Sequence, residues 1–349
     1  MQYDLTVKGS EVYENLDNNE GISDETRDAM ASHLGLGDDE DTAVFLYDGK
    51  NYVGPSGEDA DLVIFSPGGP GPHEISVPPE LLGSARGYVF ETDDDVTIHF
   101  NTVERVIAMG NGNDLVTVDG DKNTTLDGSD GNDTLITSGG DDSVTGGAGD
   151  DSVSTGDGND TIVAGNGADT VDGGAGYDVV KLQGTIDAYE ISVVDGQLVL
   201  VSTADAANSL TVDNVEFIQF TEGSLAVVGN ETDAVTLRLY QGLLDRPADQ
   251  AGAQYWLEQV NKAGATVWDQ ANAFLNTEEF LGHGELSHAD FVELLYDNAL
   301  GRAADEEGLN YWVNDLENGQ SRAQVAVNII GSAEAAEQID SVQILDGLV

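Results

Sequence analysis

The sequence predicts a multidomain protein that is mainly β, with an added α-helical part. Three observations support this prediction. An aspartate returns every nine residues from Gly110 to Lys181, short strand-like runs and one helix-like segment fill residues 1–105, and apolar residues recur at helical spacing from Thr232 onward. We therefore expect a small α+β domain, a repetitive β domain and an all-α repeat domain, in that order.

Residues 1–105 form the predicted α+β domain, and the sequence does not indicate its role. A helix is expected over Ser23–Leu34, with Ser23 or Asp24 as N-cap and Gly35 as stop. The segment Ser66–His73 lacks the Lys-Ser/Thr pair of a phosphate cradle, so we interpret it as a surface loop. The strand-like runs are Thr42–Tyr47, Tyr52–Val53, Leu62–Phe65, Tyr88–Glu91 and Val96–Phe100.

Six consecutive nine-residue blocks, from GSDGNDTLI to GGAGYDVVK, make up the clearest part of the repeat. In each block a glycine-rich turn ends in an aspartate, and an apolar residue follows two positions later. An earlier copy ends in Asp114, and the stretch around Leu126 is an irregular copy that is one residue too long. The later aspartates are Asp133, Asp142, Asp151, Asp160, Asp169 and Asp178, and their apolar partners are Leu135, Val144, Val153, Ile162, Val171 and Val180.

This pattern resembles the RTX nonapeptide family, G-G-x-G-x-D-x-U-x, which forms a calcium-binding parallel β-roll. The resemblance implies a right-handed roll over residues 106–182, in which nine residues make half a coil. Residues eighteen apart then stack on neighbouring parallel strands, about 4.8 Å apart. One edge of the roll is expected to carry Asp114, Asp133, Asp151 and Asp169, and the other edge Asp142, Asp160 and Asp178.

The residue types in the repeat favour calcium over other ligands. Stacked carboxylates repel unless a cation lies between them, and Ca²⁺ accepts six to eight carboxylate and carbonyl oxygens in a tolerant geometry. Mg²⁺ requires a tighter octahedron, and zinc or copper would want His or Cys, which the repeat lacks. Between Asn123 and Val180 every acid is Asp, whereas a surface selected only for charge would mix Asp and Glu.

We therefore expect about four to six calcium ions, by the arrangement that the resemblance implies. The seven aspartates are the expected carboxylate ligands. Glycines that adopt positive φ can turn their carbonyl groups inward as further ligands. These glycines are Gly112, Gly131, Gly140, Gly149, Gly158, Gly167, Gly176, Gly147, Gly156, Gly165 and Gly174.

The segment Asp119–Asp130 has a superficial likeness to an EF-hand loop. Position six is Thr124 rather than glycine, the last ligand is Asp130 rather than Glu, and no helices are expected on either side. We interpret it as a degenerate turn of the roll.

The charge and composition exclude several classes of partner. The net charge of −54, with only 12 basic residues, argues against nucleic acid and anionic membranes. There is no cysteine, and no window approaches eighteen apolar residues, so we expect neither disulfides nor membrane insertion. Mutual repulsion of the acids predicts that metal binding and folding of the roll are coupled.

Residues 183–230 are predicted to be a β capping segment that closes the roll, as the resemblance implies. Its strands are expected over Tyr189–Val194, Gln197–Ser202, Leu210–Val212 and Glu216–Phe220. At the other end, Val103–Met109 is predicted to be the strand that starts the roll and covers its open end.

A second internal repeat occupies residues 231–338, where Leu239–Trp256 aligns with Leu295–Trp312 at an offset of 56. It resembles a helical domain-of-unknown-function family found in bacterial surface and RTX proteins, in two copies. We interpret its paired aromatics as core, although a polysaccharide site through Trp256, Trp312, Tyr255 and Tyr311 is the alternative. Arg246 and Arg302, each three residues before an Asp, are interpreted as structural ion pairs within a loop.

The two ends of the chain bear on localisation. The N-terminal segment has no basic stretch followed by an apolar run, so no Sec signal peptide is expected. The RTX resemblance implies type I secretion, and the tail 339–349 is similar to the uncleaved C-terminal signals of that route. The five histidines form no H-E-x-x-H motif and the chain has no G-x-S-x-G, so we do not expect an enzyme.

The leading hypothesis is a secreted, calcium-dependent, non-enzymatic protein of the cell surface or extracellular matrix. Its roll folds on calcium, and its flanking domains mediate self-assembly, in an S-layer or biofilm matrix, or attachment to surface polysaccharide. One alternative is a monomeric calcium-dependent adhesin or glycan-binding protein. Another is a secreted hydrolase with its site in residues 1–105.

Overall fold

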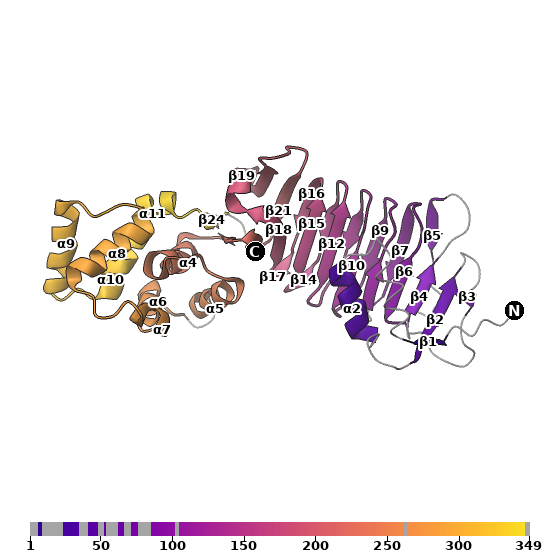
Figure 1. The fold of residues 1–349 in the computed structure, drawn as a ribbon, viewed down its shortest axis with the longest axis horizontal. Coiled ribbons are helices and arrows are strands. Elements are labelled where there is room, and N and C mark those ends of the chain that lie inside the picture. Colours follow the sequence, from indigo (N-terminus) through magenta and orange to yellow (C-terminus); the bar gives the residue numbers. More distant parts are fainter. Residues whose placement is uncertain are drawn as a thin grey trace. The chain divides into compact units, whose positions relative to one another are not determined.

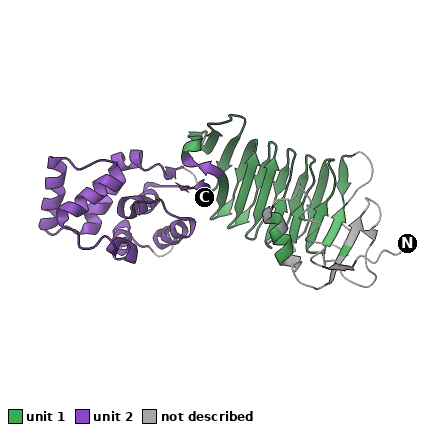
Figure 2. Ribbon diagram, viewed as in Figure 1, with its two compact units in different colours: residues 1–182, 187–215 green, residues 183–186, 216–349 purple. Residues whose placement is uncertain are grey.

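The computed structural model describes residues 6–8, 24–34, 41–47, 52–53, 62–65, 71–75, 85–101, 105–261 and 264–345. It divides into two compact units, one of residues 1–182 and 187–215 and one of residues 183–186 and 216–349 (Figure 2). Most of the predicted loop Ser66–His73 and the last four residues of the predicted tail lie outside the described residues.

The first unit is built from two sheets of short parallel strands, which the chain visits alternately (Figure 1). The parallel strands of the first sheet, in order, are β2 (Asp41–Tyr47), β4 (Leu62–Phe65), β6 (Gly87–Phe90), β8 (Arg105–Ala108), β10 (Thr124–Asp127), β12 (Ser143–Ala148), β15 (Thr161–Asn166) and β18 (Val179–Thr185). Those of the second are β5 (His73–Ile75), β7 (Val96–Phe100), β9 (Leu115–Val118), β11 (Thr134–Ile136), β13 (Ser152–Ser154), β16 (Ala168–Asp172) and β21 (Ser209–Asp213).

Three pairs of short strands complete this unit. β1 (Thr6–Lys8) and β3 (Tyr52–Val53) each pair antiparallel with β2. β14 (Asp157–Gly158) and β17 (Ala175–Gly176) pair in parallel along the turns of successive coils.

The register confirms the predicted coil. Val144 lies opposite Ile162, and Val153 lies opposite Val171, so strands eighteen residues apart are neighbours. Between Val116 and Leu135 the offset is nineteen, because the irregular copy around Leu126 carries its extra residue here. Alternation along each strand then directs one apolar residue per half-coil inward. These inward residues, at 0–2% exposure, are Val116, Leu126, Leu135, Val144, Val153, Ile162, Val171 and Val180.

The first coils have a different interior, made of aromatic side chains. Phe65 stacks on Phe90 with ring centroids 4.6 Å apart, and Tyr88 meets Phe100 edge-on at 4.8 Å. The Arg105 guanidinium lies 4.9 Å from the Phe100 centroid and donates a 2.7 Å hydrogen bond to the Asn101 carbonyl. Arg105 is only 1% exposed, so ring faces and a backbone oxygen replace its water.

The helix α2 (Asp24–Leu34) packs on the outer face of these early coils (Figure 1). Met30 is fully buried there against Leu62, Val89 and Val106. Along these strands successive side chains point alternately toward the roll interior and toward α2, and both faces are buried. Such strands read as continuous apolar runs rather than as alternating ones.

The parallel stack therefore begins before residue 105, which differs from the prediction of a separate domain up to that point. Val89 pairs with Ala108, and Val63 with Tyr88, so the strands of residues 62–100 lie in the same sheets as the repeats. The expectation that Val103–Met109 covers the open end is wrong, since β8 has β6 on one side and β10 on the other. These coils lack the Asp and Gly signature, which is why the sequence pattern did not reveal them.

The residues after β18 form β-strands, as predicted, and the first of these strands pair antiparallel. After the 3₁₀ turn η1 (Ile186–Ala188), β19 (Tyr189–Val194) and β20 (Gln197–Ser202) form a hairpin. Its two-residue turn is Asp195–Gly196, both at positive φ. β20 pairs antiparallel with β21, and β21 pairs in parallel with β16.

The second unit contains eight helices among its described residues, four in each copy of the 56-residue repeat. Copy 1 has α4 (Glu231–Leu244), α5 (Gln250–Asn261), α6 (Val267–Phe274) and α7 (Glu278–Leu281). Copy 2 has α8 (His288–Leu300), α9 (Glu306–Glu317), α10 (Arg322–Ile330) and α11 (Ala333–Gln338). None of the described helices is long and apolar enough to cross a membrane.

Three strands complete this unit. β22 (Phe217–Glu222) and β23 (Ser224–Val228) form a hairpin, and β24 (Val342–Ile344) pairs in parallel with β23. Part of the predicted tail 339–349 is thus held as a strand, with Ala226 opposite Val342.

Substituting Gly149→Ala should destabilise the roll far more than Gly196→Ala. Both glycines have positive φ, which costs an alanine about 1 kcal/mol. A Cβ on Gly149 would also overlap the Gly131 carbonyl oxygen, whereas one on Gly196 would meet nothing within 4 Å. Thermal unfolding in calcium measures both variants, and equal losses would contradict the close coil-to-coil contact.

Candidate metal centre

Each repeating aspartate uses one carboxylate oxygen to bind the preceding coil. Asp133 Oδ1 accepts a hydrogen bond from the Asp114 amide at 2.8 Å, and Asp151 Oδ1 accepts one from the Asp133 amide at 2.9 Å. The same contact links Asp114 to Val96 at 2.7 Å and Asp169 to Asp151 at 3.0 Å. Together these bonds form a continuous ladder along one edge, and its aspartates are the ones that the sequence predicted for that edge.

The other edge carries an equivalent ladder. Asp142 Oδ1 accepts from the Thr124 amide at 2.7 Å, Asp160 Oδ1 from the Asp142 amide at 2.7 Å, and Asp178 Oδ1 from the Asp160 amide at 2.8 Å. Thr124 stands where an aspartate would extend this ladder by one coil.

In five of these carboxylates the second oxygen is buried and accepts no hydrogen bond from a described residue. The repeating aspartates are at most 3% exposed. A buried carboxylate oxygen without a partner is costly, because the charge has lost its water. The atoms concerned are the Oδ2 atoms of Asp114, Asp133, Asp142, Asp151 and Asp160.

Burial also changes the acidity of these groups. It raises the pKa of Asp114, Asp133, Asp142 and Asp151 to about 7, and neighbouring carboxylates add to the rise. The backbone hydrogen bonds work in the opposite direction but are outweighed. Burial likewise raises the pKa of Asp160 and Asp169. Burial therefore makes these carboxyls harder to ionise than exposed aspartates.

The predicted glycines bring the carbonyl groups of successive coils close together. Gly131 and Gly149 show the arrangement: the Gly131 carbonyl oxygen lies where a Gly149 side chain would begin. The predicted glycines with positive φ are Gly131, Gly140, Gly147, Gly149, Gly156, Gly158, Gly165, Gly167, Gly174 and Gly176. Gly112 does not have positive φ, but a Cβ there would overlap the backbone of Asp94.

The irregular copy replaces one of these glycines by serine. Ser129 occupies the place that Gly147 and Gly165 take in the next coils, and it is one of the non-glycine residues with positive φ, at 75°. Its carbonyl oxygen lies where a Gly147 side chain would begin. The turn is thus kept at the expense of local strain.

Sequence reasoning missed a second ladder, formed by the residue that precedes each repeating aspartate. Asn132 Oδ1 accepts from the Asp150 amide at 2.9 Å, and Asp150 Oδ1 accepts from the Ala168 amide at 2.9 Å. On the other edge, Asp141 Oδ1 accepts from the Asn159 amide at 2.9 Å. These exposed side chains bind the following coil, whereas the buried aspartates bind the preceding one.

A sequence signal for this second ladder was present. The residue before the repeating aspartate is Asn or Asp in the earlier copies, at positions 113, 132, 141, 150 and 159, and becomes Ala168 and Tyr177 in the last two. The side chains of Ala168 and Tyr177 do not accept a hydrogen bond from the following coil. Their backbone amides still donate to the side chains of the preceding coil.

The donor set of the two edges fits a hard cation. Buried carboxylate oxygens and clustered backbone carbonyls are the ligands that Ca²⁺ takes, and no nitrogen or sulfur ligand is among them. No three His, Asp or Glu side chains of the described residues group around one point.

Comparison with known proteins agrees with this geometry. Residues 118–153 and 145–180 match the family model described as "RTX calcium-binding nonapeptide repeat (4 copies)". The central segment of this chain is an RTX β-roll. RTX nonapeptide repeats bind Ca²⁺, and the matched segment contains the unpaired buried oxygens of Asp133, Asp142, Asp151 and Asp160.

The helical unit also matches a family model. Residues 235–283 and 271–339 match the family model "Domain of unknown function (DUF4214)", in agreement with the two copies predicted beside the RTX roll. No curated protein matches the chain.

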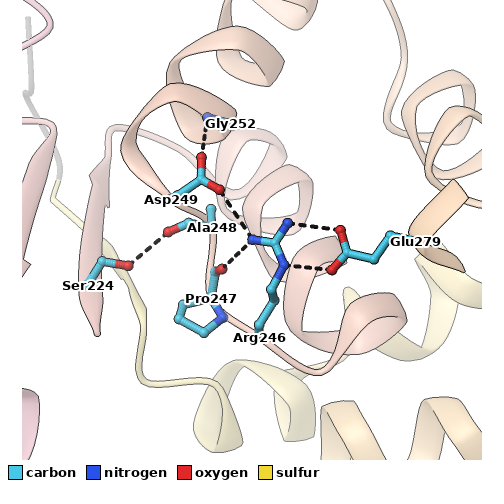
Figure 3. A network of polar contacts seen from close by, with 7 residues as sticks. All are labelled: Ser224, Arg246, Pro247, Ala248, Asp249, Gly252 and Glu279. Carbon is cyan, nitrogen blue, oxygen red and sulfur yellow. Dashed lines mark hydrogen bonds and ion pairs between the residues drawn. The ribbon is translucent and has the colours of Figure 1, made fainter. Parts of the chain in front are cut away.

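The arginines of the helical copies are structural, but their main partners differ from the prediction. Arg246 donates to both oxygens of Glu279, at 2.7 and 3.0 Å, and lies farther from Asp249, at 3.4 Å (Figure 3). Its guanidinium also lies 5.0 Å from the Tyr240 ring centroid. Asp249 instead accepts a 2.8 Å bond from the Gly252 amide at the start of α5.

Copy 2 repeats this network with Arg302, Glu334 and Tyr296. Arg302 Nη2 lies 3.0 Å from Glu334 Oε2, and its guanidinium lies 5.1 Å from the Tyr296 centroid. The acid that anchors each arginine lies in a short segment near the end of its copy, NTEEF (Asn276–Phe280) in copy 1 and GSAEA (Gly331–Ala335) in copy 2.

The paired aromatics divide into a packed and an exposed member. Trp256 stacks on Phe274 with centroids 4.7 Å apart, which agrees with a core role. Tyr255 and Tyr311 are 55% and 57% exposed. The structure thus does not gather the four aromatics into one core.

The segment Asp119–Asp130 is a turn of the roll, as expected. Asp119 pairs with His99 at 3.1 Å on the surface, and Thr124 begins β10 with its amide bound to Asp142. His73 pairs with Asp94 at 3.3 Å.

The metal-free roll should become less stable as the pH rises from 5.5 to 8. The folded-state pKa of the buried aspartates is about 7, above the unfolded value of about 3.9. Folding is therefore favoured while these carboxyls can remain neutral, and this advantage is lost as the pH rises through about 7. Circular dichroism in metal-depleted buffer measures the ordered fraction of the roll at each pH, and an ordered fraction that increases over this range would contradict the prediction.

Proposed function

We propose that this chain is a secreted, non-enzymatic calcium-binding protein whose roll becomes ordered when calcium binds. The observation that carries the proposal is the set of buried carboxylate oxygens without partners, in a segment that matches calcium-binding repeats. Calcium would replace the missing partners and neutralise the stacked charge.

In this proposal the ions lie along both edges, between successive coils. On one edge they would be held by Asp114, Asp133, Asp151 and Asp169, and on the other by Asp142, Asp160 and Asp178. Carbonyl groups of the stacked glycine turns would complete the coordination. Neighbouring pairs within the two ladders give about four to six ions.

Secretion is supported by the RTX repeats, which are typical of extracellular proteins exported by the type I route. Calcium is scarce in the cytosol, so weak sites would leave the roll unfolded for export and fold it outside. We assign the export signal to the tail 339–349.

Asp151→Asn should lower calcium binding, whereas Asp150→Asn should not. In Asp151→Asn the amide oxygen can still accept the Asp133 amide, but the free carboxylate oxygen is replaced by NH₂. Asp150 is a neighbouring, exposed carboxylate that binds the Ala168 amide, and asparagine preserves that bond. Isothermal titration should show the loss of up to about two ions, because Asp151 has a ladder neighbour on each side.

Circular dichroism at increasing calcium provides the second readout. Asp151→Asn should require several-fold more calcium for folding, and Asp150→Asn should match the parent protein. If the two variants bound calcium equally, the assignment of the buried ladder as the ligand set would be wrong.

We further propose that the flanking parts mediate assembly into a surface layer or matrix, or attachment to surface polysaccharide. The support is that the chain joins a repeat scaffold, the RTX roll, to a duplicated helical module that matches DUF4214. A monomeric calcium-dependent adhesin is the second candidate, favoured by the exposed Tyr255 and Tyr311. No observation on the described residues favours a hydrolase.

Electron microscopy with and without calcium separates these two candidates. Assembly predicts lattices or filaments in millimolar calcium that disperse on chelation. Asp151→Asn serves as a control, since it should shift the calcium requirement of assembly. Monomers at every protein and calcium concentration would contradict assembly and favour the adhesin.

A further inference from the structure

A groove opens on the helical unit, between the starts of α4 and α6 and the end of α10. Its volume is about 620 Å³, within the range of small-molecule sites. Val235 of α4, Val267 of α6 and Val327 of α10 form its apolar floor and walls, and Trp268 lies among its lining residues. Trp268 is 53% exposed, so part of its ring is open to a ligand.

The two copies of the repeat provide an internal comparison for this groove. The aligned helices α4 and α8 differ by 56 residues, so Val235 corresponds to Phe291. For α6 and α10 the capping boxes Thr266–Asp269 and Ser321–Gln324 set an offset of 55, so Val267 corresponds to Arg322. Both small residues of copy 1 are thus large residues in copy 2.

In copy 2 those larger side chains fill the corresponding space. Phe291 is fully buried, and the Arg322 guanidinium lies 4.9 Å from its ring centroid. Arg322 also donates to the Leu286 carbonyl. The groove in copy 1 is therefore not a requirement of the repeat fold, because the same fold is closed in copy 2.

Trp268 differs from its counterpart in the opposite direction. At the offset of 55 it corresponds to Ala323, which is 5% exposed and packs inside the unit. The repeat thus needs no large aromatic at this position. A large aromatic ring that stays exposed beside two small valines is typical of a ligand groove, whereas in a packed core such a ring would be buried.

The polar groups of the groove indicate the chemistry of its ligand. Glu231 is the charged residue among those that line it, and it is paired with the buried Arg238 at 2.8 Å. No lysine or arginine is among the described lining residues, and the chain carries a net charge of −54. An anionic ligand would therefore be repelled.

Neutral hydrogen-bonding groups remain available. The side chains of Thr232 and Asn328 line the groove and make no hydrogen bond with another described residue. A hydroxyl and a carboxamide beside a half-exposed indole match a ligand with one apolar face and a polar rim. A pyranose ring has this character, since its C–H face can stack on an indole while its hydroxyls bind the polar groups.

We propose that this groove binds a neutral carbohydrate, with Trp268 as the stacking platform and Thr232 and Asn328 as hydrogen-bonding partners. The site deepens the attachment role proposed above and rests on it for its biological meaning. It lies in residues other than the aromatics that the sequence suggested for glycan binding, since Tyr255, Trp256, Tyr311 and Trp312 do not line the groove.

Binding of neutral oligosaccharides of glucose, galactose, mannose and N-acetylglucosamine to the full chain in calcium tests the proposal. Titration calorimetry should detect saturable binding that Trp268→Ala weakens at least about tenfold, which corresponds to about 1.4 kcal/mol. Val267→Arg, which installs the residue of copy 2, should close the groove with a similar loss. Leu281→Ala removes an apolar side chain of α7 that is 58% exposed and lies outside the groove lining, and it should leave binding unchanged.

The outcomes distinguish this site from the calcium proposal. Binding of none of these sugars, binding only of polygalacturonate or of an apolar dye, or equal binding by Trp268→Ala would overturn the carbohydrate site. Circular dichroism on the same samples reports whether calcium orders the roll. If the roll folds with calcium but no sugar binds, only the proposed carbohydrate site is refuted. If calcium does not order the roll, the calcium proposal is refuted.

Discussion

The roll depends on how the two oxygens of each repeating aspartate are used. One oxygen closes a hydrogen bond to the amide of the preceding coil, as between Asp151 and Asp133. The other oxygen is buried with nothing to bind, and burial of the charge raises the pKa of Asp151 to about 7. The first contact fixes the spacing of the coils, and the second creates the demand for a cation.

Around this arrangement the rest of each turn is constrained. The coils approach so closely that the Gly131 carbonyl oxygen occupies the space of a Gly149 side chain, which leaves glycine as the residue that fits. The exposed ladder through Asn132 and Asp150 binds the following coil, opposite in direction to the buried ladder. Each coil is thus hydrogen-bonded to both of its neighbours, and the repeating apolar residue of each half-coil is buried in the interior.

The first coils reach the same stacking by different means. They lack the repeating aspartates, and their wider interior is filled by Phe65, Tyr88, Phe90 and Phe100 with the buried Arg105. Their outer face is covered by α2 through Met30. Ordinary hydrophobic burial thus stabilises the N-terminal coils, which gives the cation-dependent coils a packed neighbour on which to stack.

The helical unit shows how duplication separates structure from function. Both copies keep the arginine that joins a loop to an acid in the last helix of the copy, Arg246 with Glu279 and Arg302 with Glu334. They differ at Val235, Val267 and Trp268, where copy 1 is open and copy 2 is filled. The retained contacts maintain the fold, and the differences mark the groove.

The sequence alone determined the nine-residue coil, the two edges of aspartates, the inward apolar residues and the two helical copies. Each of these repeats at a fixed spacing, and a fixed spacing maps directly onto a stack or a helix face. It could not show that residues 62–100 belong to the same stack, because those coils are held by aromatic packing that carries no periodic signature. It also could not show the partner of Arg246 or the groove at Trp268. Those features depend on which side chains meet across helices far apart in the chain, and only the tertiary structure decided that.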